Sequence, residues 1–178
     1  EAELKAVNLQ TGLESTLLIL STRLKATGHR PEIQVIRDYG DLPMVDCYPG
    51  QMNQVFMNLL SNAIDALDGF WQTQALNQDY FQPRIYIETA LMTPQWIAVD
   101  IGDNGGGIEQ DHLERIFDPF FTTKSVGKGT GLGLSISHEI VTRHHQGRLT
   151  CQSCPGQGAK FRIEIPVGLA QLGGDRVA

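Results

Sequence analysis

Three polar side chains, Asn58, Asn62 and Asp65, recur at helical spacing within an otherwise apolar segment of the chain. In a helix this spacing aligns them on one face as a polar column. Asparagine is a poor helix former, and a solvated helix face more often carries Lys and Glu, so the column favours a ligand site. Amide and carboxylate oxygens suit Mg²⁺, which takes few ligands from the protein itself. The alternative is an ordinary solvent-exposed face.

A second group of residues, Asp103-Asn104-Gly105-Gly106-Gly107-Ile108, directly follows a predicted strand. Adjacent glycines let a backbone approach a ligand closely and adopt positive φ angles. A carboxylate at the end of the strand can accept a hydrogen bond from an exocyclic amine. The segment therefore favours a binding loop for a base, and the alternative is a simple Asn-Gly turn.

The third group is a segment rich in Gly, Thr and Lys that leads into a predicted helix. Its glycines alternate with other residues from Gly127 to Gly133. The first N–H groups and the dipole of a helix attract anions, and the lysines add positive charge. The spacing matches neither a Walker loop nor a dinucleotide fingerprint. The residues expected to contribute charge or donors here are Lys124, Lys128, Thr122, Thr123 and Thr130.

The elements that must position these groups can be predicted from hydrophobic periodicity. The helix that carries the column spans about 50–69, with an apolar stripe of Met52, Val55, Phe56, Leu59, Leu60, Ala63, Ile64 and Leu67. Further helices are predicted at 8–26, 111–116 and 132–145, and strands at 32–37, 44–47, 84–92, 96–101, 148–153 and 160–166. This order predicts an α+β fold, a two-layer α/β sandwich in which about three helices cover one mixed sheet of about five strands.

Composition limits the function. A net charge of −6 over 178 residues argues against a basic surface for nucleic acid. No apolar run approaches the roughly 18 residues that a membrane helix needs, so no membrane contact is expected. The 3 cysteines do not make a disulfide framework, which favours a reducing, cytoplasmic compartment. Because the chain begins at Glu1 without Met, we expect it to be a fragment of a longer protein.

The motifs together resemble those of the GHKL superfamily. Asn58-Leu-Leu-Ser-Asn62-Ala-Ile-Asp65-Ala66 resembles its N-box, and Asp103-Asn-Gly-Gly-Gly107-Ile its first glycine box. The stretch from Phe117 to Lys124 resembles the F-box, and Gly127 to Leu134 the second glycine box. Across about residues 8–167 the set is similar to the ATP-binding catalytic domain of bacterial sensor histidine kinases.

The resemblance implies a role for each matching residue. Asn62 would coordinate Mg²⁺, Asp103 would bind the adenine amine, and Asn58 and Lys124 would act in catalysis. Residues 117–131 would form a mobile lid over ATP. The further ATP contacts implied are Asn58, Asp65, Ala66, Gly105, Gly107, Ile108, Phe117, Phe121, Thr122, Thr123, Gly127, Lys128, Gly129, Thr130, Gly131, Leu132, Gly133, Leu134 and Ala159. Ala159 stands where the family usually has Thr, so one adenine-side hydroxyl is missing.

The resemblance also implies what surrounds the site. Residues 9–167 would be the catalytic domain, 1–8 would lead from an upstream dimerisation hairpin that carries the acceptor histidine, and 168–178 would be a disordered tail. None of the 5 histidines fits an acceptor on a helical dimerisation hairpin, and His138, which lies inside the helix predicted after the lid, is interpreted as structural. The implied partners are that upstream domain, within a homodimer, and a downstream response regulator.

Three functions remain open on this fold. Hydrolysing relatives keep Glu at the position of Asn58 to activate water, and asparagine cannot take up a proton, so a histidine kinase is favoured over a fast hydrolase. A protein serine kinase of the anti-sigma type and a non-catalytic nucleotide-sensing module are the alternatives.

Overall fold

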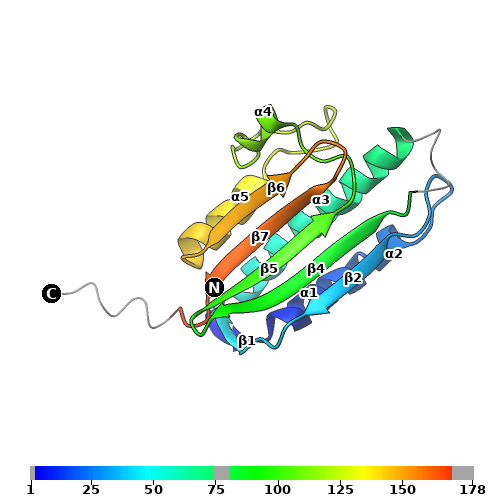
Figure 1. The fold of residues 1–178 in the computed structure, drawn as a ribbon. Coiled ribbons are helices and arrows are strands. Elements are labelled where there is room, and N and C mark those ends of the chain that lie inside the picture. The colour runs from blue at the N-terminus through cyan, green and yellow to red at the C-terminus, as the bar shows by residue number, and fades with distance from the viewer. Residues whose placement is uncertain (1–2, 74–80, 170–178) are drawn as a thin grey trace.

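The computed structural model describes residues 3–73 and 81–169, and its centre is a five-stranded sheet of order β2-β4-β5-β7-β6 (Figure 1). Its strands are β2 (Gln34–Tyr39), β4 (Arg84–Thr93), β5 (Trp96–Asp103), β6 (Arg148–Ser153) and β7 (Ala159–Pro166). β2 runs parallel to β4, and all other neighbours are antiparallel. The sheet is therefore mixed, as predicted.

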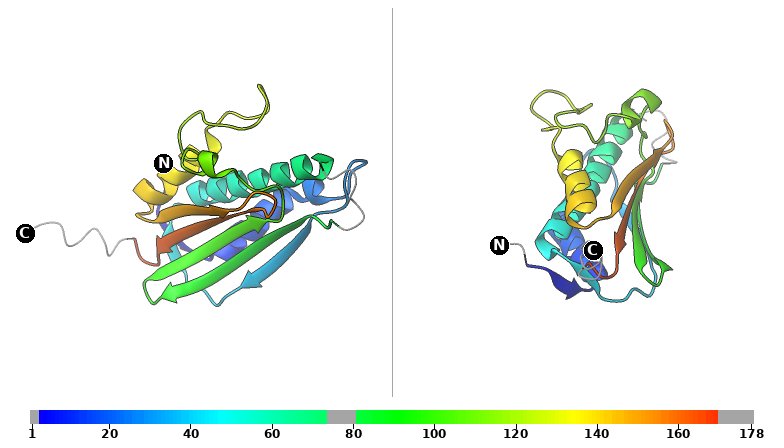
Figure 2. Two further views of the ribbon diagram at one scale, coloured as in Figure 1. Left: turned by 45° about the horizontal axis from the view of Figure 1, so that its top comes forward. Right: turned by 90° about the vertical axis from the view of Figure 1, so that its left-hand side faces the viewer.

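The helices lie on one face of this sheet (Figure 2). They are α1 (Leu9–Ile19), α2 (Ser21–Leu24), α3 (Pro49–Thr73), α4 (Gln110–Leu113) and α5 (Gly133–Glu139), which continues as a π-helical turn, η2 (Ile140–His144). α3 lies between α1 and α5 and contacts both. The predicted two-layer α+β sandwich is confirmed.

The core forms between these layers because each contributes one apolar face. On α3, every residue of the predicted stripe from Met52 to Leu67 is buried, and Trp71 extends it by one turn. On the sheet, alternate residues such as Ile85, Ile87 and Ile101 point toward the helices. The helix that carries the polar column is thus held along its whole length by burial of the opposite face.

The N-terminal region differs from prediction in two ways. β1 (Lys5–Val7) was not predicted, and it pairs antiparallel with β3 (Val45–Cys47) in a separate two-stranded sheet. The helix predicted over 8–26 is divided, because Leu20 has a ψ angle of 0° and its N–H bonds to Leu18 and Thr16. The short α2 therefore begins as a separate helix at Ser21.

The helix predicted over 132–145 is also irregular, and the cause is His145. Its amide bonds to the carbonyl of Ile140, five residues back, at 3.1 Å. The buried ring accepts a hydrogen bond from the amide of Tyr48 at 3.0 Å, so its other nitrogen donates to Ile140 at 2.8 Å. The wide turn thus follows from a contact between residues distant in sequence.

The segment after the helix predicted over 50–69 and the C-terminal tail lie partly outside the described residues. α3 continues to Thr73, so Phe70 and Trp71 are helical, and both pack against Phe81 with ring centroids 5.1 and 6.0 Å apart. These aromatic residues contribute to the core, whereas residues 74–80 are not described. Of the tail predicted over 168–178, only Gly168 and Leu169 are described, and Leu169 is buried.

No helix within the described ranges is long and apolar enough to span a membrane. The cysteines Cys47, Cys151 and Cys154 are all unpaired thiols.

Candidate functional site

The predicted motifs come together at one end of the molecule. There the second half of α3, the segment after β5, α4, the lid (residues 117–131) and the start of α5 lie next to one another (Figures 1 and 2). The sheet brings them together because β5 ends beside α3 and the chain then returns through α5 along the same helix. The geometry therefore joins segments up to about 75 residues apart, such as Asn58 and Gly133.

Asp103 is the last residue of β5 and only 9% exposed. Burial raises the pKa of its carboxyl group to about 6, and hydrogen bonds from the backbones of Gly105 and Ala159 partly oppose that shift. The Gly105 amide donates to Oδ1 at 2.8 Å. Ala159, which lacks the usual hydroxyl, thus still contributes through its backbone. A buried acceptor with few partners suits recognition of an amine.

The glycine loop after Asp103 is fastened to the β6–β7 hairpin. The Ile108 amide donates to Ser153 Oγ at 2.8 Å, and the Gly156 amide donates to the Gly106 carbonyl at 2.6 Å. Gly158 has a φ angle of +86° and lies so close to the Asp103 carbonyl that a Cβ atom there would collide with it. The hairpin therefore fixes the position of Asp103, a contribution that the sequence did not indicate.

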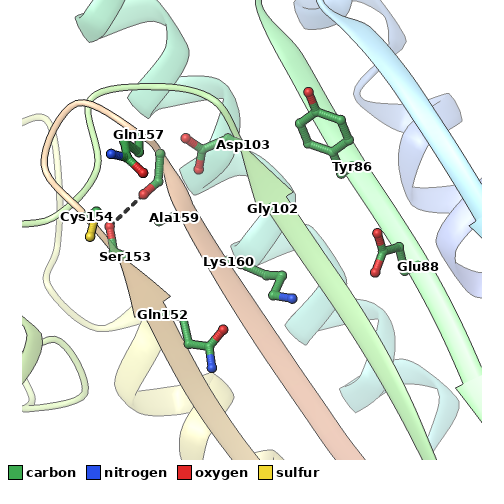
Figure 3. Close-up of a pocket in the computed structure, with 11 residues that line it drawn as sticks. Tyr86, Glu88, Gly102, Asp103, Gln152, Ser153, Cys154, Gln157, Ala159 and Lys160 are labelled. Carbon is green, nitrogen blue, oxygen red and sulfur yellow. Dashed lines mark hydrogen bonds between the residues drawn. The ribbon is translucent and has the colours of Figure 1, made fainter.

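A pocket of about 390 Å³ borders Asp103 (Figure 3). It also includes Tyr86, Gly102 and Lys160, which alternate along their strands with residues buried under the helices. The pocket thus opens on the sheet face away from the helices. No residue of the polar column or of the lid lines it, so it is distinct from the site where the motifs converge.

Asn58 connects α3 to the start of α5. Its amide nitrogen donates to the carbonyl of Gly133 and to Ser137 Oγ, both at 3.1 Å. Leu132, the residue before α5, provides no side-chain cap for the helix. The first N–H groups of α5 therefore remain available to an anion, with Asn58 fixing their position.

Asn62 lies one turn further along α3 and is half-buried. In the described parts of the chain, no group of three or more His, Cys, Asp or Glu side chains could hold a metal ion. A single amide oxygen still fits Mg²⁺ that keeps several waters and binds substrate phosphates. The donor set therefore fits a metal that arrives with a nucleotide.

The two sides of the lid are joined by a hydrogen bond at its base, and residues 122–128 between them are exposed. The Phe120 amide donates to the Gly131 carbonyl at 2.8 Å. Gly131 has a φ angle of +68°, and a Cβ atom there would collide with the Phe120 backbone. At its N-terminal end the lid is anchored by Phe117, whose ring stacks on His138 with centroids 4.9 Å apart.

Lys124 of the lid lies against α3. Its Nζ atom is 2.5 Å from one carboxylate oxygen of Asp65, and Arg23 Nη2 is 2.6 Å from the other. Arg23 lies outside every motif of the sequence and is not among the predicted site residues. An arginine 42 positions before its partner leaves no local signal.

The remaining predicted residues divide into two groups by exposure. Ala66, Thr122, Thr123, Gly127, Lys128 and Thr130 are exposed, whereas Gly107, Ile108, Phe121, Gly129, Leu132 and Leu134 are partly buried. Phe121 is covered by the Arg115 guanidinium, 4.7 Å from the ring centroid. Every predicted residue lies on the elements that converge at this end of the fold, or on the hairpin beside it.

The 5 histidines have different surroundings. His145 is buried, and burial lowers its pKa. His138 packs on Phe117, His112 lies beside Phe121, and His144 bonds to Gln51. The exposed His29 lies in the loop after α2.

Known proteins resemble this chain in sequence. Residues 48–169 match the model of the histidine kinase-, DNA gyrase B- and HSP90-like ATPase family. The chain is 48% identical over 126 residues to the two-component sensor PprA of Pseudomonas aeruginosa, covering 70% of this chain and 13% of PprA. It is 34% identical over 169 residues to the sensor histidine kinase ZraS of Escherichia coli O157:H7, covering 94% of this chain and 32% of ZraS. The chain thus spans a third or less of these relatives.

Among solved structures, the catalytic domain of the histidine kinase ThkA in a nucleotide-free form matches with a TM-score of 0.74 and 26% identity. The match covers 93% of this chain and 99% of that domain.

Proposed function

Because the chain belongs to the family of histidine kinase-, DNA gyrase B- and HSP90-like ATPases, as the ATP-binding domain of a sensor kinase, we propose that it binds Mg·ATP. The bound nucleotide then provides the γ-phosphate for transfer to a histidine. One observation carries the proposal. A buried carboxylate, a polar helix column and an exposed basic segment meet at the end of the fold where α5 begins.

Each part of the site supports recognition of one part of the nucleotide. Asp103 accepts a hydrogen bond from the adenine amine, and the hairpin beside it holds that carboxylate in place. Asn62 supplies an oxygen to Mg²⁺, which neutralises charge on the phosphates. Lys124, Lys128 and the free N–H groups of α5 bind the phosphates as the lid closes.

The position of Asn58 favours transfer over hydrolysis. Its amide nitrogen donates to Gly133 and Ser137, so the side chain holds α5 and offers no base to a water molecule. Phosphoryl transfer depends chiefly on positioning and on neutralising charge, and both are available here. Water is therefore a poor nucleophile in this site.

The acceptor histidine lies outside this chain in our proposal. The environments of His138 and His145 are those of packed, structural side chains. The acceptor then belongs to an upstream dimerisation hairpin, and the phosphoryl group passes from it to a response regulator, as the name of the two-component sensor PprA suggests for that relative.

The test is labelling with γ-labelled ATP and Mg²⁺. The isolated chain should bind ATP but remain unlabelled, and a longer protein that includes the preceding segment should gain acid-labile, base-stable phosphohistidine there. Labelling of the isolated chain at His29, His138 or His145 would contradict these roles.

The same assay separates the alternatives. Transfer to serine on an added protein would indicate a kinase of the anti-sigma type. ATP binding with no transfer in either protein would indicate a nucleotide-sensing module.

A further inference from the structure

Two cations from different parts of the chain share one carboxylate beside the proposed nucleotide site. Arg23 on α2 contacts Oδ1 of Asp65 at 2.6 Å, and Lys124 on the lid contacts Oδ2 at 2.5 Å. All three side chains are partly exposed, at 42%, 34% and 35% for Arg23, Asp65 and Lys124. They therefore remain able to exchange partners with a charged ligand.

Arg23 is held in place by a second ion pair. Arg30, only 6% exposed, donates to the backbone carbonyl of Arg23 at 2.5 Å and pairs with Asp68. Asp65 and Asp68 lie one turn apart on α3. The end of α2 is thus fastened to α3 at two successive turns, so Arg23 stays near Asp65 whatever the lid does.

Lys124 has no comparable anchor. It lies in the exposed middle of the lid, whose contacts at the two ends are made by Phe117, Phe120, Phe121 and Gly131. Of the two cations on Asp65, Arg23 is therefore the stationary one and Lys124 the one able to leave.

The charge of Asp65 matters because of its place on α3. It lies three residues after Asn62, and an unpaired carboxylate there would repel a triphosphate. Burial alone would raise the pKa of Asp65, but hydrogen bonds from Lys124 and Arg23 lower it below its ordinary value. The group is thus ionised at neutral pH, and it must stay paired if Lys124 moves to the phosphates.

We propose that Arg23 is a positioning residue for triphosphate recognition: it keeps Asp65 paired, so that Lys124 is free to pass from Asp65 to the nucleotide when the lid closes. This inference rests on the proposed ATP-binding function. It adds a residue from outside the sequence motifs, and it makes α2 part of the phosphate end of the site.

The experiment is calorimetric titration of the chain with AMP, ADP and ATP. The variants are Arg23→Gln, Arg23→Lys, Asp65→Asn and the double variant Arg23→Gln/Asp65→Asn. Arg37→Gln is the matched control. The Arg37 side chain is about as exposed as that of Arg23, at 41%, and it pairs with Glu14, 2.7 Å from it, outside the proposed nucleotide site.

Arg23→Gln should weaken ATP binding by roughly three- to tenfold, ADP binding less, and AMP binding not at all, because the repulsion from unpaired Asp65 grows with phosphate charge. The loss should shrink in high salt, which screens exposed charges. Arg23→Lys should retain most of the affinity, and Asp65→Asn should restore ATP binding in the double variant. Arg37→Gln should bind all three nucleotides as the unmodified chain does.

Equal weakening for AMP and ATP, or no recovery in the double variant, would assign Arg23 a merely structural role and overturn the inference. Unchanged ATP affinity in Arg23→Gln would also overturn it while leaving the proposed function intact. Failure of the unmodified chain to bind ATP would instead remove the proposed function, and this inference with it.

Discussion

The backbone amide of Phe120 donates a hydrogen bond to the carbonyl of Gly131 over 2.8 Å and joins the two sides of the lid at its base. Residues 122–128 between them are all exposed. Segments with few buried apolar contacts open at low free-energy cost, so this part of the lid should exchange its amide hydrogens rapidly without nucleotide.

The first prediction follows from that arrangement. A triphosphate gives the lid lysines an opposite charge to close on, so amide exchange across residues 121–130 should slow when an ATP analogue and Mg²⁺ are added. Hydrogen exchange monitored by mass spectrometry measures this, with peptides from β4 as the internal control. Identical exchange with and without the analogue would contradict the assignment of the lid.

The second prediction concerns Asn62. If its amide oxygen binds Mg²⁺, Asn62→Ala should weaken binding of Mg·ATP far more than binding of ATP in the presence of a chelator. Calorimetry under both conditions gives the two affinities. A loss of the same size in both conditions would remove Asn62 from the metal site.

The third prediction is a pH dependence of stability caused by Asp103. Folding raises the pKa of this buried carboxyl from 3.8 to about 6, so the folded chain binds a proton more tightly than the unfolded chain. The group therefore favours folding below about pH 4, and this contribution is lost as the pH rises through about 6. A pKa difference of about 2 corresponds to roughly 3 kcal/mol.

Asp103→Asn should remove this dependence. Between about pH 4 and pH 7, the difference in free energy of unfolding between the variant and the unmodified chain should shift by roughly 2 kcal/mol in favour of the variant. Urea unfolding at a series of pH values measures it. Asp41→Asn, at an exposed position, is the control, and a parallel pH profile for Asp103→Asn would show that Asp103 is not buried as described.

The fourth prediction uses two glycines of the β6–β7 turn. Gly156 and Gly158 both have positive φ angles, +79° and +86°, but only at Gly158 would a Cβ atom meet another segment, the backbone at Asp103 and Asn104. Left-handed backbone costs a non-glycine residue about 1–2 kcal/mol at either position. Gly158→Ala should therefore be clearly less stable than Gly156→Ala in thermal unfolding, and it alone should also weaken ATP binding. Equal effects would mean that the hairpin does not position Asp103.

The elements of this fold that could be predicted from sequence are those with local signals. The stripe of α3 from Met52 to Leu67 repeats at helical spacing, so both the helix and its buried face were apparent. β1, with three residues, is too short to show a period, and it forms only because β3 lies alongside it. The π-helical turn depends on His145 bonding to Tyr48, a contact 97 positions apart.

The same distinction applies to the site. Asp103, Asn62 and the glycines of the lid lie in short motifs with a recognisable spacing. The pairing of Arg23 with Asp65 and the fastening of the glycine loop to Ser153 join residues more than 40 positions apart. Such contacts are created by the order of the strands and helices, and no local pattern encodes them.

The central claim is that this end of the fold binds adenine nucleotides through Asp103. The most direct test is titration of the chain with a non-hydrolysable ATP analogue and with its GTP counterpart, each with Mg²⁺. The unmodified chain should bind the ATP analogue at one site and prefer it over the GTP analogue. Asp103→Ala removes a hydrogen bond to a charged group, worth about 1.5–3 kcal/mol, so affinity for the ATP analogue should fall roughly 10- to 150-fold and the preference should shrink with it. No binding of the ATP analogue, or an unchanged ratio of the two affinities in Asp103→Ala, would contradict the claim.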